Sequence, residues 1–137
     1  MPGEFRNLKA WQLGIALAND IYTVTDSWPS RELYGLSSQI RRAAFSVPAN
    51  VAEGRGRQGR REYRHFVEIA YGSLCEVETA LVLARLRSYI TEDEEQSFDR
   101  QIDELARVLR GLMRYLADSS PRTSQASAPE NEAASAG

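Results

Sequence analysis

Apolar residues recur at helical spacing in four successive segments of the chain. In the first, two adjacent rows run between Leu8 and Thr25. One row holds Leu8, Trp11, Ile15, Ala18, Tyr22 and Thr25, and the other holds Ala10, Leu13, Leu17, Ile21 and Val24. A surface helix of a monomer buries about 100° of its circumference. The extra row therefore predicts a second contact, with another helix or another subunit.

A second helix is expected from about Gly35 to Glu53, because Trp28-Pro29 ends the first one and a residue before proline disfavours the α conformation. Pro48 lies inside this second helix. Since proline removes a backbone hydrogen bond and clashes with the preceding turn, we expect a kink or break near residues 44–47. Three glycines are expected to end the helix before the next begins: Gly54, Gly56 and Gly59.

The third helix is expected to be the longest, with an apolar row that ends near Arg87 and Ser88. This row holds Tyr63, Phe66 or Val67, Ala70, Leu74, Val77, Leu81 and Ala84. Thr91 and Glu94 then form a capping box, whose side chains satisfy amides at a helix start. The fourth helix carries Phe98, Ile102, Leu105, Leu109, Leu112 and Leu116. Four amphipathic helices with short connections predict an all-α fold, an up-and-down antiparallel four-helix bundle.

The 137 residues suit one domain, and the composition divides them in two. Residues 1–118 are expected to form the bundle. Residues 119–137 contain no aromatic or branched aliphatic side chain, so we expect a disordered tail there. The single cysteine, Cys75, is expected as a small, partly buried apolar residue. A single cysteine and the absence of an apolar segment behind Met1 favour a cytoplasmic protein. No apolar run is long enough to cross a bilayer, so we expect no membrane partner.

Polar residues lie directly beside the apolar stripe of the second helix. Burying an unpaired amide or carboxylate costs a few kcal/mol or more, roughly, so this face is either a satisfied network or a ligand site. Ser73 and Glu76 on the third helix are expected to face it, and Arg41 and Arg42 can pair the carboxylates. We interpret the set as a structural polar network: Gln39, Arg42, Ser46, Asn50, Glu53, Ser73 and Glu76.

Motifs of enzymes and cofactor sites are weak in this chain. Glu62 and His65 have the spacing of di-iron bundles, but His65 is the single histidine, so one chain cannot build that site. A solvated helix face is the simpler interpretation, and a metal shared across a symmetric oligomer is the alternative. The glycine run lacks the strand and lysine of a phosphate loop. We therefore expect no enzyme, no cofactor and no metal ligand.

An arginine-rich stretch is the remaining candidate for function. Seven arginines against Glu53 and Glu62 give residues 41–64 a local charge of +5 in a chain whose formal net charge is -2. Five of them lie at a loop and helix start, where they are suited to phosphates: Arg55, Arg57, Arg60, Arg61 and Arg64. Tyr63 and His65 alternate with them and can stack on bases, although Tyr63 also fits the core row. The same patch can grip acidic residues of a partner protein.

Several motifs together resemble one family of helical bundles. They are Trp11, Pro29 with Glu32 and Gly35-Leu36, Gln39-Ile40-Arg41-Arg42-Ala43, the stretch from Ser46 to Gly54, and the stretch from Ala70 to Glu76. Over about residues 5–117 they resemble the proteins encoded in 23S ribosomal RNA intervening sequences. The resemblance implies a four-helix bundle that assembles as a homopentameric ring. The accessory proteins of diversity-generating reverse transcriptases are related bundles. Through them the resemblance also implies RNA or DNA, and a polymerase, as partners.

The resemblance supplies no settled biochemical activity. Together with the arginines it favours a non-enzymatic, oligomeric bundle that binds RNA or DNA phosphates. The alternative is a protein-interaction scaffold that uses the ring as its platform and binds no nucleic acid.

Overall fold

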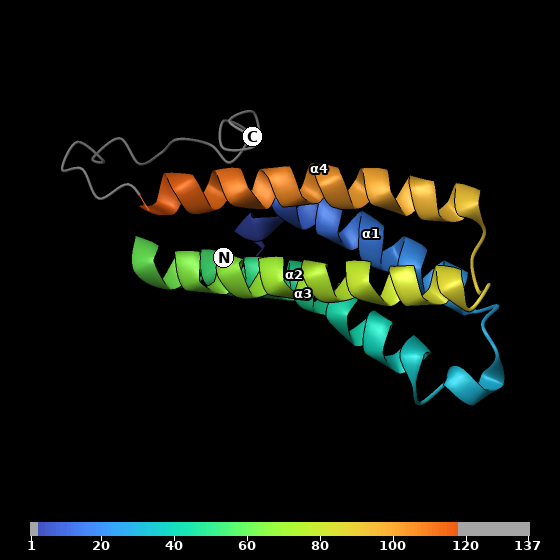
Figure 1. Cartoon of the computed structure of the whole chain (residues 1–137). Helices are drawn as coiled ribbons and strands as arrows, with labels where there is room; N and C mark the ends of the chain where they lie inside the picture. The colour runs from blue at the N-terminus through green and yellow to red at the C-terminus, as the bar shows by residue number, and fades with distance from the viewer. Residues whose placement is uncertain (1–2, 118–137) are drawn as a thin grey trace.

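Four long helices form the body of the protein in a computed structural model, which describes residues 3–117 (Figure 1). The helices are α1 (Lys9–Thr25), α2 (Leu36–Arg55), α3 (Arg60–Leu86) and α4 (Glu92–Ala117). Two short 3-10 helices, η1 (Glu4–Asn7) and η2 (Ser30–Glu32), precede α1 and α2. No strand occurs between residues 3 and 117. The expected tail at 119–137 lies outside the described residues.

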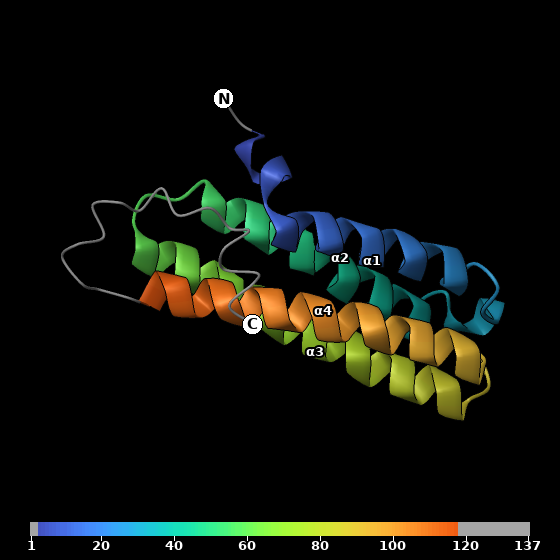
Figure 2. The same ribbon diagram turned by 90° about the horizontal axis from the view of Figure 1, so that it is seen from above.

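The helices pack as the periodicity predicts. Each contacts the next along the chain, and α1 also contacts α4, so that the four close around one core (Figures 1 and 2). The short connections make successive helices antiparallel. The all-α, up-and-down four-helix bundle is thus confirmed.

The core follows the expected apolar rows. All six apolar residues of the predicted α4 row are buried: Phe98, Ile102, Leu105, Leu109, Leu112 and Leu116. On α3, Val67 is fully buried and Phe66 only half-buried, which decides the position that the sequence left open. Each such aliphatic side chain contributes about 1.5–3 kcal/mol by leaving water.

The two rows of α1 have different surroundings. Leu17 and Ile21 of the second row are buried in the core, whereas Ile15 and Tyr22 of the first are 41% and 47% exposed. Phe45 of α2 is 61% exposed. It lies one turn from Arg41, whose guanidinium is 5.2 Å from the Tyr22 ring centroid. We call Ile15, Tyr22 and Phe45 the apolar seam.

Pro48 does not break α2, which runs without interruption from Leu36 to Arg55, so of the expected kink or break the break does not occur. Pro48 is buried where α1 and α2 cross. A Cβ atom on Gly14 of α1 would lie 3.3 Å from the ring carbons of Pro48. Close packing between the two helices therefore holds the chain helical around the proline.

Gly54 also differs from expectation, because it lies within α2 rather than at its end. A Cβ atom there would be 2.9 Å from Phe66 Cβ and 3.0 Å from the Tyr63 carbonyl oxygen. Gly54 thus allows α2 and α3 to approach closely. The helix ends instead at Gly56. After α3, the capping box forms as predicted: the Glu94 amide donates to Thr91 Oγ1 at 3.1 Å, and the Thr91 amide to Glu94 Oε1 at 2.8 Å.

Candidate nucleic-acid interface

The predicted arginines surround the turn between α2 and α3. The amides of Gly56 and Arg57 donate to carbonyls of the last α2 turn, and Gly59 adopts a positive φ of 93° directly before α3. This left-handed conformation suits glycine, because it lacks a Cβ atom. The turn places Arg55 and Arg57 at the end of one helix and Arg60, Arg61 and Arg64 at the start of the next.

Three of these arginines form exposed ion pairs with nearby carboxylates. Arg55 pairs with Glu4 at 3.3 Å, Arg57 with Glu53 at 2.5 Å, and Arg64 with Glu68 at 3.3 Å. Ion pairs this exposed contribute about 0–1 kcal/mol, so a phosphate can compete for the guanidinium groups.

Arg60 and Arg61 differ sharply in their surroundings. Arg60 is half-buried, donates to the Tyr115 carbonyl oxygen, and lies 4.6 Å from the Tyr115 ring centroid. Arg60 therefore ties α3 to α4 as well as contributing charge. Arg61 is exposed, and no residue between 3 and 117 forms a hydrogen bond or ion pair with its guanidinium group.

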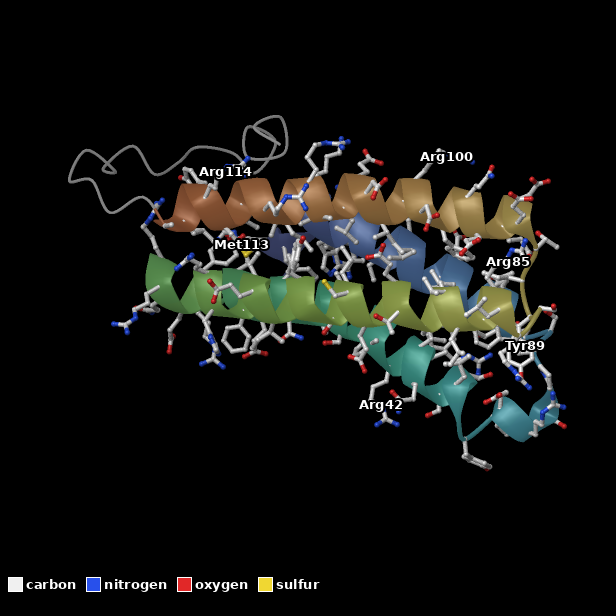
Figure 3. The ribbon with its side chains drawn as sticks, viewed as in Figure 1. Arg42, Arg85, Tyr89, Arg100, Met113 and Arg114 are labelled. Carbon is white, nitrogen blue, oxygen red and sulfur yellow. The ribbon has the colours of Figure 1, made fainter. Side chains whose placement is uncertain are left out.

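The fold adds arginines that the sequence analysis missed. Arg107, Arg110 and Arg114 lie in the second half of α4. The antiparallel packing brings this half beside the first half of α3 (Figure 3), where Arg60 meets Tyr115 and Arg110 meets Tyr71. A seven-residue step from Arg100 to Arg107 to Arg114 marks one face of the helix in the sequence. This spacing indicates part of a larger basic surface only once the helix that packs against α4 is known. We call the eight residues the arginine surface: Arg55, Arg57, Arg60, Arg61, Arg64, Arg107, Arg110 and Arg114.

Acidic residues gather at the opposite end of the bundle. The first turn of α4 consists of Glu92, Asp93, Glu94 and Glu95, and Asp26 follows α1 at the same end. Two of these acidic residues form ion pairs: Asp26 with Arg41 at 3.1 Å and Glu95 with Arg85 at 3.6 Å. The near-neutral chain is therefore basic at one end and acidic at the other.

The predicted polar network is smaller in the structure than in the sequence analysis. Ser46 and Ser73 share a hydrogen bond of 2.8 Å between their Oγ atoms, and Asn50 Nδ2 donates to the carbonyl oxygen and Oγ of Ser46, both at 2.8 Å. These three side chains are half-buried and link α2 to α3. The other members do not join them.

The remaining four residues are exposed on the surface. Arg42 donates to Ser38 at 3.2 Å, and Glu53 pairs with Arg57. Gln39 and Glu76 line a hollow between α2 and α3. Arg41 pairs instead with Asp26, so the expected pairing of Glu53 and Glu76 by Arg41 and Arg42 is not formed.

Other candidates can now be placed. Tyr63 is 9% exposed and belongs to the core, whereas His65 is exposed and meets the Phe66 ring edge-on at 5.6 Å. Cys75 is exposed rather than partly buried, because it lies on the outer side of α3. Within residues 3–117, no group of three His, Cys, Asp or Glu side chains is placed to hold a metal ion.

A hollow of about 590 Å³ lies at the acidic end, where α2 and α3 diverge (Figure 1). Glu32 borders it. Its carboxylate accepts hydrogen bonds from the Leu36 amide at 2.9 Å and the Tyr89 hydroxyl at 2.8 Å. These bonds, the backbone one above all, lower the pKa of Glu32.

Comparison with known proteins agrees with this fold. The sequence profile described as 23S rRNA-intervening sequence protein matches residues 6–111. The chain belongs to this family. A crystal structure of a protein of unknown function from the S23 ribosomal protein family of Bacteroides thetaiotaomicron is similar, with a TM-score of 0.69 and 23% identity. The match covers 77% of this chain and 98% of that one, and at this identity it supports the fold.

No curated protein matches this member of the intervening-sequence family. Among its described helices, none combines the length and apolar character that a membrane span requires.

Proposed function

We propose that this protein is a non-enzymatic, self-associating bundle that binds nucleic-acid phosphates through the arginine surface. The observation that carries the proposal is the gathering of arginines from the α2–α3 turn, α3 and α4 at one end of the bundle. Backbone phosphates dominate the affinity of proteins for nucleic acids. A basic end opposite an acidic end also orients the molecule as it approaches a polyanion.

The surface retains groups for a phosphate to bind. Arg61 and Arg107 are exposed, and within residues 3–117 neither guanidinium group forms a hydrogen bond or ion pair. The guanidinium group presents a planar fork of donors that matches phosphate oxygens. The single cysteine fits a reducing, cytoplasmic setting in which such a polyanion is met.

The test compares two triple variants with the same change in charge. Arg57→Ser, Arg61→Ser and Arg64→Ser remove three exposed arginines from the arginine surface. Arg31→Ser, Arg42→Ser and Arg87→Ser remove three exposed arginines that lie outside it. Binding to a labelled RNA or DNA is measured by fluorescence anisotropy over a range of salt concentrations. We expect the first variant to lose affinity about tenfold or more and to flatten the salt dependence, since each phosphate contact releases about 0.9 counterion on duplex DNA.

The control variant should bind nearly as the unchanged protein does. Absence of binding by the unchanged protein at low salt would contradict the proposal, and equal losses in both variants would assign the effect to net charge alone.

A protein-interaction scaffold is the second candidate, and the apolar seam favours it. Ile15 and Tyr22 of α1 and Phe45 of α2 are large apolar side chains left exposed. Exposed apolar patches mark contacts with other proteins. A homopentameric ring, which the family resemblance implies, would cover the seam. If the ring forms but binds no nucleic acid, the scaffold replaces our first proposal.

A further inference from the structure

Three arginines at the basic end lie close to aromatic rings. Arg57 is 5.0 Å from the ring centroid of Phe66, Arg60 is 4.6 Å from that of Tyr115, and Arg110 is 6.0 Å from that of Tyr71. Each pair joins different elements: the α2–α3 turn to α3, α3 to α4, and α4 to α3. These cation–π contacts hold guanidinium groups at the surface and place a positive charge over each ring.

Covered rings are poor platforms for unpaired bases. Proteins that bind single strands use open aromatic faces, on which successive bases stack. Here Phe66, Tyr71 and Tyr115 are half-buried, each with a guanidinium over it, and Tyr63 lies in the core. Along the arginine surface, His65 is the exposed ring among those described. A single ring cannot provide a stacking track.

The same contacts prepare the guanidinium groups for fixed phosphates. Arg110 also donates to the Tyr71 hydroxyl at 3.1 Å, and Arg60 to the Tyr115 carbonyl oxygen. Each of these two side chains is therefore held by a hydrogen bond as well as by its contact with a ring. Holding them in the free protein reduces the conformational entropy lost on binding. Rigid positive charges match a ligand whose phosphates are themselves held in a regular array.

Spacing along the helices agrees with such an array. At a rise of about 1.5 Å per residue, Arg107 and Arg114 are separated by about 10 Å along α4, and Arg60 and Arg64 by about 6 Å along α3. One strand of a DNA duplex carries a phosphate for about every 3.4 Å of the helix axis. These separations correspond to about three and about two phosphate steps of one duplex strand.

From these contacts we infer that the arginine surface recognises the phosphate backbone of a double helix rather than unpaired bases. The inference rests on the proposed function and names its ligand class. Double-stranded RNA and double-stranded DNA share this chemistry, since neither exposes base faces.

The experiment measures fluorescence anisotropy with four labelled probes at one salt concentration: duplex DNA and duplex RNA of about 20 base pairs, and oligo-dT and oligo-U of the same length. We expect at least one duplex to bind about tenfold or more tightly than both single strands. The comparison between the two duplexes then assigns the preferred helix form.

A pair of double variants tests the role of the arginine beside Tyr71. Arg110→Ser with Arg114→Ser should weaken duplex binding and lower the slope of log K against log salt by about two units. Arg31→Ser with Arg87→Ser, which removes two exposed arginines at the opposite end of the bundle, is the matched control and should leave both unchanged. Circular dichroism checks that the helices are intact in every variant.

The outcomes separate this inference from the proposed function. If single strands bind as tightly as duplexes, or more tightly, and still depend on Arg110 and Arg114, the duplex inference is wrong and nucleic-acid binding stands. If no probe binds, both are wrong. Equal losses in the two double variants would also overturn the inference, because they would show a dependence on charge without position.

Discussion

Glu32 shows how one side chain can join two connections of the bundle. It lies in η2, between α1 and α2, and accepts a hydrogen bond from Tyr89, between α3 and α4. Its other oxygen accepts the amide of Leu36 at the start of α2, in the manner of a helix cap. Gly35 makes room for this arrangement, because a Cβ atom there would be 2.8 Å from Glu32 Oε1.

These bonds predict a pH dependence of stability. Because they favour the ionised carboxylate, the pKa of Glu32 is lower in the folded protein than in the unfolded chain. Its stabilising contribution is therefore present above the unfolded pKa and is lost as pH falls through the folded pKa. Glu32→Gln should lower the free energy of unfolding at pH 7, and the difference from the unchanged protein should shrink in acid. Urea denaturation at several pH values measures this, and a constant difference would contradict it.

Substitution by alanine should change the stability of the protein in opposite directions at Gly54 and at Gly72. Alanine stabilises an exposed helix interior by about 0.5–1 kcal/mol relative to glycine. Gly72 is exposed with no atom within 4 Å of a built Cβ, so Gly72→Ala should stabilise α3 by that amount. At Gly54 the new Cβ would press on Phe66, and we expect overpacking to destabilise the protein by about 1–3 kcal/mol. Thermal unfolding monitored by circular dichroism compares the two, and stabilisation by Gly54→Ala would show that α2 and α3 separate easily.

At the level of the elements, periodicity predicted nearly all that depends on one helix alone. The α4 row, the end of α3 and the capping box at Thr91 follow from local spacing and local hydrogen bonds, and they are found as expected. The continuity of α2 at Pro48 and the burial of Gly54 depend on a partner helix. Local spacing carries no information about that partner.

The candidate site divides in the same way. The turn arginines are neighbours in sequence and were predicted, whereas Arg107, Arg110 and Arg114 join them only through antiparallel packing. The polar network was overestimated for a related reason. Helical spacing places Ser46 and Glu53 on the same face of one helix, two turns apart, but Glu53 is exposed and Ser46 is half-buried. Which of them is covered depends on how α3 packs against α2, and local spacing carries no information about that packing.

The capping box gives a prediction for a single element. Thr91→Ala removes the hydroxyl that accepts the Glu94 amide, and should lower the free energy of unfolding by about 0.5–2 kcal/mol. Thr79→Ala is the control, because the exposed Thr79 hydroxyl bonds only the Cys75 carbonyl within α3 and alanine is the better helix former. Chemical denaturation should show the first change and little or none from the second. Equal effects would mean that the cap contributes nothing.

On the scale of the whole molecule, charge and apolar surface lie on different parts of the bundle. The arginine surface occupies one end, on the α2–α3 turn, α3 and α4, and the apolar seam follows α1 and α2. A subunit can therefore bind a neighbour through the seam and still expose its arginines. In a ring with cyclic symmetry, equivalent basic ends would lie on the same face, which multiplies the charge that a polyanion meets.

The seam predicts that the protein self-associates. Phe45→Glu or Ile15→Glu would place a carboxylate in the apolar contact, which costs several kcal/mol, roughly, unless a partner charge is near. Multi-angle light scattering should find a closed oligomer for the unchanged protein, with the mass of five subunits if the family resemblance holds, and a smaller species for either variant. Arg100→Glu, an exposed change on the outer side of α4, controls for the added negative charge and should keep the larger mass. A monomer that persists at high concentration would contradict the prediction, and a pentamer insensitive to both seam substitutions would move the contact to another face of the bundle.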